Sequence, residues 1–157
     1  MTLVEVFPQW SWIPDLRARE KKAAIKEMLS HLVSEGRIKD DAARKAEKVV
    51  HKREAQGSTA IGKGLAIPHA KGCTFIKEVF GVFARSREGL PFDAVDGGLV
   101  HVLFLVVSPE EKAAQHLDIM RRVARLHLDE KTLRFLAKDD KLETLEEIFK
   151  EIDDAFP

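Results

Sequence analysis

The sequence predicts an α/β fold in which helices pack against a sheet. Residues 99–107 form a nearly continuous apolar run rich in valine and leucine, which is typical of a central strand buried on both faces. Apolar residues at helical spacing mark amphipathic helices before and after this strand. Because an apolar sheet face and an apolar helix stripe must cover one another, this order of elements favours a layered α/β architecture.

Length and composition indicate one ordinary globular domain. The 157 residues contain no repeat or low-complexity linker, so we expect a single domain over residues 1–157. With 26 basic and 26 acidic residues, no charge excess favours nucleic acid as a partner. No apolar run reaches the length of a membrane span, and the N-terminus lacks a signal-peptide layout. The single Cys73 cannot form an internal disulfide. We therefore expect a cytoplasmic protein without membrane insertion.

The first third of the chain is predicted to hold two helices. Residues 1–14 carry aromatic side chains around two prolines, so we expect an irregular segment that covers an edge of the core. One amphipathic helix is predicted over residues 18–35, where Gly36 is placed to end it. A second is predicted over Asp41–Ala55, with Arg53 near its end. At the C-terminal end of a helix a positive charge interacts favourably with the helix dipole. The alternative interpretation is that the guanidinium of Arg53 binds phosphate.

The middle of the chain is predicted to form the sheet. We expect a turn at Lys71–Thr74, a strand at Phe75–Ala84 and the central strand at Leu99–Val107. His101 lies inside the central strand near its start, so we interpret it as a structural residue.

The last third is predicted to be helical. Ser108-Pro109-Glu110-Glu111 contains a capping box with proline at the first helical position, which predicts a helix running to about His127. The residues predicted to form its buried stripe are Leu117, Met120, Val123, Ala124 and Leu126. The arginines predicted to point largely outward are Arg121, Arg122 and Arg125. Two more helices are predicted at Glu130–Ala137 and Leu142–Ile152.

His116 lies in the first turns of the helix that follows the central strand. Ligand sites in open α/β sheets often lie at such strand ends. A histidine on a helix is nevertheless most often a surface residue, so the residue pattern alone leaves both interpretations open.

Residues 57–69 form the most informative segment. They hold three of the nine glycines within eight positions, and glycine accepts positive φ and lets a backbone approach a ligand closely. Pro68 has a fixed φ and pushes Ile67 toward an extended conformation, immediately before His69. We therefore expect a stiff turn that presents an imidazole beside backbone N–H groups and hydroxyls. Such a place is suited to hold a phosphoryl group.

A nucleotide-binding phosphate loop is the main competing interpretation of this segment, and it fails. Gly57–Gly64 matches G-x-x-x-x-G-K-[ST] except at the last position, where Gly64 replaces the hydroxyl that binds magnesium. A charged, helix-like run precedes the segment where a strand is required, and Pro68 interrupts any helix after it.

Two motifs carry a family resemblance. Residues 53–69 read R-E-x-x-G-S-T-x-I-G-x-G-x-A-I-P-H, and Ser108-Pro109-Glu110-Glu111 is followed by His116-Leu117. Both resemble the signatures of the enzyme IIA domains of the bacterial phosphotransferase system, of the fructose, mannitol and nitrogen type. The likeness runs from about Leu16 to about Ile152. It implies a mixed sheet of about five strands with helices packed on both faces.

The resemblance also assigns roles to residues. His69 would accept a phosphoryl group through Nε2, since a neutral imidazole is nucleophilic near pH 7. His116 would donate a hydrogen bond to a phosphoryl oxygen, and Arg53 would contribute positive charge. Ser58 and Thr59 would add hydroxyl and backbone donors. The resemblance implies no metal, nucleotide or other cofactor.

The expected partners follow from the same resemblance. A small phosphocarrier protein would supply phosphate from its own phosphohistidine, and a IIB domain or a regulated protein would be the acceptor or target. Because the sequence carries no attached IIB or membrane domain, we expect a freestanding regulatory protein of the nitrogen type. The first alternative is a freestanding fructose- or mannitol-type sugar component.

Two other classes of function are alternatives to this expectation. One is an interaction module that keeps the fold without phosphotransfer; the presence of His69, His116 and Arg53 counts against it. The other is a metal hydrolase that uses His69, His116 and Asp118. The chain contains no HExxH and no paired-cysteine spacing, which disfavours a metal site.

Overall fold

A computed structural model describes residues 1–138 and 142–155. Its strands are β1 (Trp12–Ile13), β2 (Ala60–Gly62), β3 (Leu65–Ala66), β4 (His69–Cys73), β5 (Phe80–Leu90) and β6 (Val100–Pro109). Its α-helices are α1 (Leu3–Val6), α2 (Lys21–Ser34), α3 (Asp40–Ala55), α4 (Ala113–Ala124), α5 (Glu130–Lys138) and α6 (Leu145–Ala155). Its 3-10 turns are η1 (Gln9–Ser11), η2 (Glu110–Lys112), η3 (Arg125–Leu128) and η4 (Leu142–Thr144). Within the described ranges, no helix combines the length and the apolar character needed to cross a membrane.

Strand β6 is the centre of a mixed, six-stranded sheet. On one side it pairs antiparallel with β5, which in turn pairs parallel with β1. On its other side β6 pairs parallel with β3 near its start and with β4 near its end. Strand β2 closes that edge by pairing antiparallel with β3. The predicted mixed α/β sheet is confirmed.

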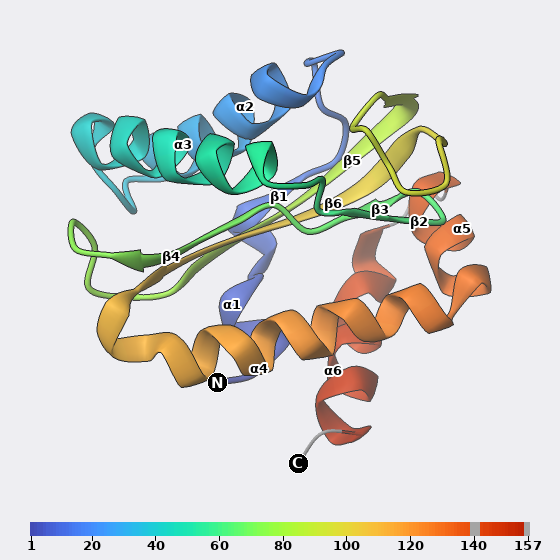
Figure 1. The fold of residues 1–157 in the computed structure, drawn as a ribbon. Coiled ribbons are helices and arrows are strands. Elements are labelled where there is room, and N and C mark those ends of the chain that lie inside the picture. The colour runs from blue at the N-terminus through green and yellow to red at the C-terminus, as the bar shows by residue number, and fades with distance from the viewer. Residues whose placement is uncertain (139–141, 156–157) are drawn as a thin grey trace.

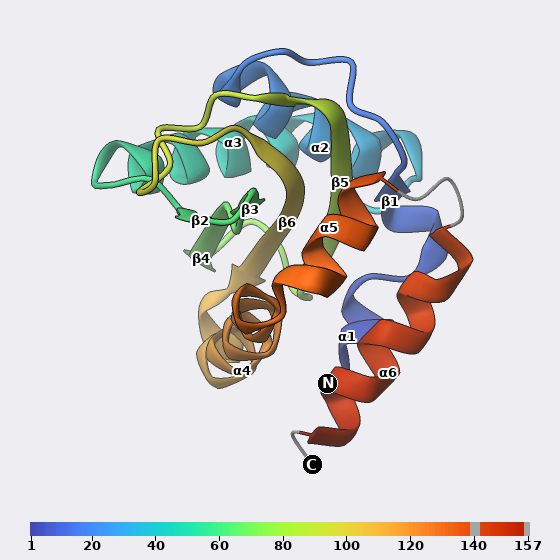
Figure 2. The same cartoon turned by 90° about the vertical axis from the view of Figure 1, so that its right-hand side faces the viewer.

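Helices cover both faces of this sheet, as predicted (Figure 1). One face packs against α2 and α3, and its core includes Ile25, Met28 and Val50. The other face packs against α1, α4, α5 and α6, and its core includes Phe83, Phe104 and Phe149. Figure 2 shows the sheet between these two helical layers, with α4 and α6 on the side opposite α3. Residues 102–107 of β6 enter the two cores alternately, which explains why this part of the strand is apolar on both faces.

The N-terminal segment covers one edge of the core. It forms α1, η1 and β1 in place of one long regular element. Phe7 is 1% exposed and packs edge-on against Phe104, with ring centroids 5.2 Å apart. Trp12 packs edge-on against Phe83 at 6.5 Å. These contacts give the segment the structural role that its aromatic residues predict.

Several predicted boundaries in the sheet are wrong. Residues 57–69, expected as a loop, contain the short strands β2 and β3, and β4 extends through the predicted turn to Cys73. The strand predicted at Phe75–Ala84 begins at Phe80 and runs to Leu90. Pairing with β6 sets these limits, because Phe80 lies opposite Val107 and Leu90 opposite Val100. Such pairing is not visible in a local pattern.

The predicted capping box at Ser108 does not form. Ser108 continues β6 and is fully buried, and α4 begins only at Ala113, after η2. Neither η2 nor α4 has a side-chain hydrogen bond at its N-cap. The Ser108 hydroxyl is instead hydrogen-bonded to His116.

The exposed and buried faces of α4 also differ from the prediction. Leu117, expected in the buried stripe, is 51% exposed, whereas Arg122, expected outside, is 9% exposed. Arg122 lies between Asp118, with Nε 3.0 Å from Oδ2, and Asp153 of α6, with NH1 2.9 Å from Oδ1. The carboxylate of Asp153 allows the positive charge of Arg122 to be buried. Because Asp153 belongs to α6, the residue pattern of α4 alone could not predict this burial.

Candidate functional site

His69 is the first residue of β4 and lies opposite Val106 in the parallel pairing with β6. Its Nδ1 is 2.9 Å from the carbonyl oxygen of Ile67. Because a carbonyl oxygen can only accept a hydrogen bond, Nδ1 carries the proton and Nε2 keeps its lone pair. Pro68 lies between the two partners, and its own carbonyl accepts the Val106 N–H at 3.1 Å. The strand pairing and the proline therefore fix the backbone on which the imidazole stands.

His116 reaches the same place from the first turn of α4. It is 5% exposed, and its ring centroid is 5.5 Å from that of His69, with the planes inclined by 54°. Its Nδ1 is 2.6 Å from the hydroxyl oxygen of Ser108 at the end of β6. The structure thus brings the two histidines together, from residues 47 positions apart in the sequence (116 − 69).

The environment favours the neutral form of both histidines. Burial lowers the pKa of His69, and the positive charges of Arg53 and Lys71 lower it further; the bond to Ile67 and the charge of Glu54 act in the opposite direction. Burial, followed by His69 and Lys71, lowers the pKa of His116 from 6.5 to about 4. Near pH 7 both rings are therefore uncharged, and His69 is available as a nucleophile.

Positive side chains border a cavity of about 300 Å³ beside His69. Its lining includes Lys52 and Arg53 from the end of α3, with His69 and Lys71 from β4. Arg53 is held in position because one of its guanidinium nitrogens donates to the carbonyl of Gly57 at 2.7 Å. An anion entering this cavity meets fixed positive charge beside the imidazole.

Ser58 and Thr59 lie in the adjoining segment, with their hydroxyls bonded within the protein. The Ser58 hydroxyl donates to the carbonyl of Phe92, and the Thr59 hydroxyl donates to the carboxylate of Glu54. Thr59 is only 4% exposed. In this arrangement the two hydroxyls stabilise the segment that precedes His69, while the predicted contact with a phosphoryl group stays a prediction.

Three residues of the site were not identified from the sequence. Lys71 lies in a segment that was interpreted as a turn, yet its charge acts on both histidines. Ser108 was assigned to a helix cap, and its partner is His116. Glu54 follows Arg53 in the family motif, but its buried contacts with Thr59 depend on the fold of the next five residues. No local pattern distinguishes these roles.

Asp118 does not join the two histidines as a ligand set. Its carboxylate is paired with Arg122 on the next turn of α4. Within residues 1–138 and 142–155, no three histidine, cysteine, aspartate or glutamate residues are grouped so that they could hold a metal ion.

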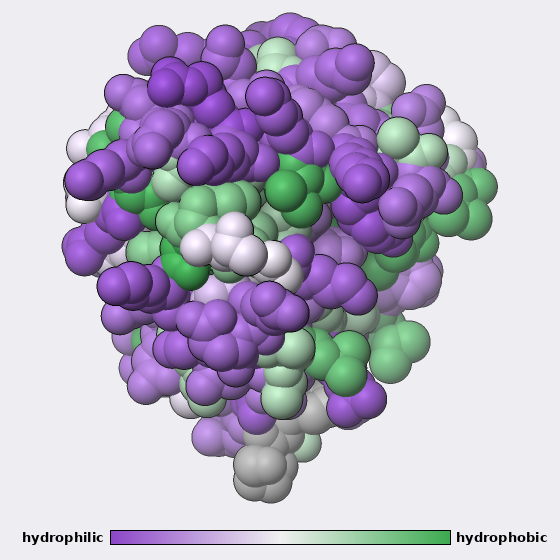
Figure 3. All heavy atoms as spheres, turned by 60° about the vertical axis from the view of Figure 1, so that its left-hand side comes forward, coloured by the Kyte–Doolittle hydropathy of each residue, from purple (hydrophilic) through white to green (hydrophobic). Residues whose placement is uncertain are grey.

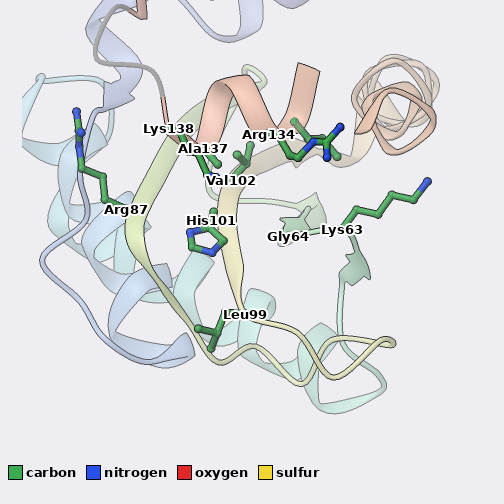
Figure 4. Close-up of a pocket in the computed structure, with 10 residues that line it drawn as sticks. Lys63, Gly64, Arg87, Leu99, His101, Val102, Arg134, Ala137 and Lys138 are labelled. Carbon is green, nitrogen blue, oxygen red and sulfur yellow. The ribbon is translucent and has the colours of Figure 1, made fainter. Parts of the chain in front are cut away.

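Other hollows lie outside this site. Figure 3 shows apolar side chains gathered between hydrophilic ones on one side of the molecule. A cavity of about 420 Å³ is lined by Ile38, Phe75 and Phe80 among others. Figure 4 shows a cavity of about 280 Å³ near the start of β6, with His101 at its centre. His101 bonds through Nδ1 to the carbonyl of Ser86 at 2.9 Å, in keeping with a structural role. Neither cavity is lined by His69 or His116.

Comparison with known proteins gives several relatives over most of the chain. A nitrogen regulatory protein of Bradyrhizobium diazoefficiens is 32% identical over 83% of this chain and 82% of that protein. The fructose-specific EIIA component of the phosphotransferase system of Haloferax volcanii is 33% identical over 84% of each protein. The fructose-specific EIIABC component of Bacillus subtilis is 29% identical over 98% of this chain. The chain spans about a quarter of that longer protein, 24% of its length.

Solved structures show the same fold. The nitrogen regulatory protein IIA-Ntr of Neisseria meningitidis superposes with a TM-score of 0.82 at 28% identity, covering 92% of this chain and 97% of that one. A complex of enzyme IIAMTL and phosphorylated enzyme IIBMTL from Escherichia coli gives a TM-score of 0.77 at 17% identity, over 92% and 99% of the two chains.

These likenesses put the chain in the IIA class of phosphotransferase-system proteins. Residues 6–152 match the family described as "Phosphoenolpyruvate-dependent sugar phosphotransferase system, EIIA 2". The chain belongs to this family, and the family resemblance of its motifs is confirmed.

The low pKa of His116 predicts that this residue makes the fold sensitive to acid. Between pH 6.5 and about 4 the unfolded chain binds a proton at His116 that the folded chain does not. The free energy of unfolding therefore falls as the pH is lowered through this range, by on the order of 3 kcal/mol from this residue. The free energy of unfolding is measured in urea at pH 7 and at pH 4. On going from pH 7 to pH 4, it should fall by less for His116→Gln than for wild type. Gln115→Ala, which changes an exposed and uncharged residue of α4, should lose as much stability as wild type. An equal loss in wild type and His116→Gln would contradict the prediction.

The position of Lys71 predicts a second effect on the histidines. Lys71→Met removes a positive charge that opposes protonation of both rings, so the pKa values of His69 and His116 should both rise. The measurement is an NMR titration of the imidazole C–H signals. Lys77→Met removes an exposed lysine of the neighbouring segment and should leave both pKa values unchanged. Equal titration curves for wild type and Lys71→Met would show that Lys71 does not act on this site.

Proposed function

We propose that this protein is a phosphohistidine carrier that accepts a phosphoryl group on Nε2 of His69. The observation that carries the proposal is the hydrogen bond from Nδ1 of His69 to the Ile67 carbonyl, which leaves Nε2 unprotonated in a histidine that lines a cavity bordered by positive side chains. Membership of the EIIA type 2 family supports the same function.

The proposed reaction is transfer between two imidazoles. The lone pair on Nε2 forms a new N–P bond while the N–P bond of the donor phosphohistidine breaks, and that electron pair returns to the donor ring. No proton has to leave Nε2, because Nδ1 carries the proton of the neutral ring. The role of the protein is therefore to orient the ring and to stabilise charge on the transferred group.

Charge stabilisation is assigned to three side chains. Arg53 and Lys71 supply positive charge at the cavity beside His69. His116 is neutral and bonded at Nδ1 to Ser108; when the hydroxyl donates this bond, Nε2 carries the hydrogen, and its N–H can donate a hydrogen bond to a phosphoryl oxygen. Backbone and hydroxyl donors of Ser58 and Thr59 are assigned a supporting role in the same segment.

The phosphoryl donor is proposed to be the phosphohistidine of a small phosphocarrier protein that is charged from phosphoenolpyruvate. For the next step we favour regulation, in which phosphorylation at His69 alters binding to another protein. The likeness to the nitrogen regulatory proteins of Neisseria meningitidis and Bradyrhizobium diazoefficiens supports this choice. Transfer to a IIB domain is the second candidate, and the fructose-specific relative of Haloferax volcanii, at 33% identity, favours it.

Phosphorylation by enzyme I, a phosphocarrier protein and labelled phosphoenolpyruvate tests the carrier function. Wild type should acquire acid-labile label, and His69→Ala should acquire none. His116→Ala should be labelled on the order of 100-fold more slowly, as expected when a donor to developing charge is removed. His51→Gln should be labelled at the wild-type rate. Unlabelled wild type, with a donor that labels a known IIA protein in the same assay, would contradict the proposal.

A second experiment separates regulation from sugar transport. Phosphorylated protein is mixed with purified IIB domains of the fructose and mannitol types, and loss of label from His69 is followed with time. For a regulatory protein the label should stay on His69, whereas rapid and complete transfer to a IIB domain would favour the sugar-transport function.

A further inference from the structure

We propose that Glu54 is a positioning residue for His69, because it fixes the segment that selects which imidazole nitrogen is protonated. This inference rests on the proposed phosphoryl acceptance by Nε2 and names a group that controls it without touching the reacting atoms. Glu54 acts through Thr59 and Ile67.

Glu54 lies in the last turn of α3 and is 7% exposed, so its carboxylate is largely removed from water. Its oxygens lie 3.1 and 3.3 Å from the backbone nitrogen of Thr59, and one of them, Oε1, also accepts the Thr59 hydroxyl. A single carboxylate thus holds both donors of one residue. Such charge-assisted hydrogen bonds are stronger than neutral ones and confine Thr59 to one position.

From Thr59 a chain of backbone hydrogen bonds leads to the imidazole. The Thr59 carbonyl accepts the Ile67 N–H at 3.1 Å, and the Ile67 carbonyl accepts the His69 Nδ1–H at 2.9 Å. Between these residues β2 and β3 form a small antiparallel pair in which Ala60 lies opposite Ala66. The carboxylate therefore holds the base of a hairpin whose outgoing end carries Ile67 and His69.

The position of the Ile67 carbonyl matters because a neutral imidazole has two tautomers. With the proton on Nδ1, Nε2 can attack phosphorus; with the proton on Nε2, it cannot. The hydrogen bond to one ring nitrogen decides which form is present. If the hairpin base is loosened, the Ile67 carbonyl is no longer fixed opposite Nδ1, and the unreactive tautomer gains population.

Lys21 of α2 compensates the buried charge of Glu54. Its ammonium nitrogen is 3.0 Å from Glu54 and 3.2 Å from Asp93, and it lies 4.9 Å from the centre of the Phe92 ring. The lysine side chain is 17% exposed, so this ion pair is well shielded from solvent. A buried carboxylate without such a partner is strongly unfavourable. Lys21 therefore helps to keep the Glu54 carboxylate in the position from which it binds Thr59.

The loop that carries Asp93 holds the hairpin base from its other side. The Phe92 carbonyl accepts the Ser58 hydroxyl, and the Val95 N–H donates to the Ala60 carbonyl at 3.3 Å. Residues 58–60 are thus fixed both from α3 and from the segment after β5. This arrangement explains why a short hairpin can present an imidazole with a defined orientation.

The test compares Glu54→Ala and Glu54→Gln with wild type. The matched control is Glu47→Ala, which also removes a carboxylate of α3 that bonds a side chain, His51, at 3.2 Å. Two-bond ¹H–¹⁵N correlation spectra of the unphosphorylated proteins, at a pH where the imidazoles are neutral, report the tautomer of His69. Rates of labelling by the phosphocarrier protein report function. The far-ultraviolet circular dichroism of each variant reports folding.

Wild type and Glu47→Ala should both show His69 protonated at Nδ1. Glu54→Ala should show an increased population protonated at Nε2, and labelling slower by on the order of 10-fold or more, as for other residues that orient a reactive ligand. Glu54→Gln keeps one oxygen acceptor, so it should show a smaller change in the same direction. A role in stability alone would not alter the tautomer of a folded protein.

A folded Glu54→Ala with the wild-type tautomer and labelling rate would overturn the inference while leaving the carrier function intact. Unlabelled wild type would overturn the carrier function, whatever the tautomer. If Glu54→Ala does not fold, the tautomer of His69 is measured in Glu54→Gln and Lys21→Met instead. A wild-type tautomer in both of these folded variants would equally overturn the inference.

Discussion

The hydrogen bond between Nδ1 of His69 and the carbonyl of Ile67 is the contact on which the proposed chemistry depends. It leaves a lone pair on Nε2 without any proton transfer. Ile67 and His69 are only two residues apart in sequence, and in a flexible loop this hydrogen bond would not be maintained. Here the Ile67 N–H is bound by Thr59, and the Pro68 carbonyl is bound by Val106 of the central strand. The orientation of the His69 imidazole thus depends on the backbone hydrogen bonds that fix Ile67 and Pro68 in the sheet.

The electrostatics of the site balance two opposing requirements. Positive side chains are needed to attract a phosphoryl group, yet they also disfavour a further positive charge on the imidazoles. Burial acts in the same direction, so both histidines remain neutral beside Arg53 and Lys71. A neutral nucleophile beside fixed cations is suited to phosphoryl transfer, in which the protein mainly positions groups and stabilises charge.

The relatives differ in function while sharing this fold. Nitrogen regulatory and fructose-specific proteins are similar to the chain at 32% and 33% identity, so overall identity does not separate the two groups. The proposed acceptance of a phosphoryl group by His69 is compatible with either function.

The sequence by itself determined the family and the fold class, and it drew attention to His69. Glycines and a proline before a histidine form a local signal, and the apolar run of β6 is a local signal for a central strand. Helices α3 and α5 were predicted within one residue at each end, because their apolar spacing and end signals are also local. These features depend on residues that are close together in the chain, so they can be predicted from the sequence.

Only the tertiary structure decided the partners of those residues. Ser108 could cap a helix or continue a strand; it lies in β6, which pairs with β4 as far as Pro109, and its hydroxyl is hydrogen-bonded to His116. Arg122 was expected in solvent, and a carboxylate of α6 allowed it to be buried. Glu54 binds Thr59 only because the chain turns back at the end of α3. Each of these contacts joins groups from different elements, and the free energy that selects them arises when the elements pack together.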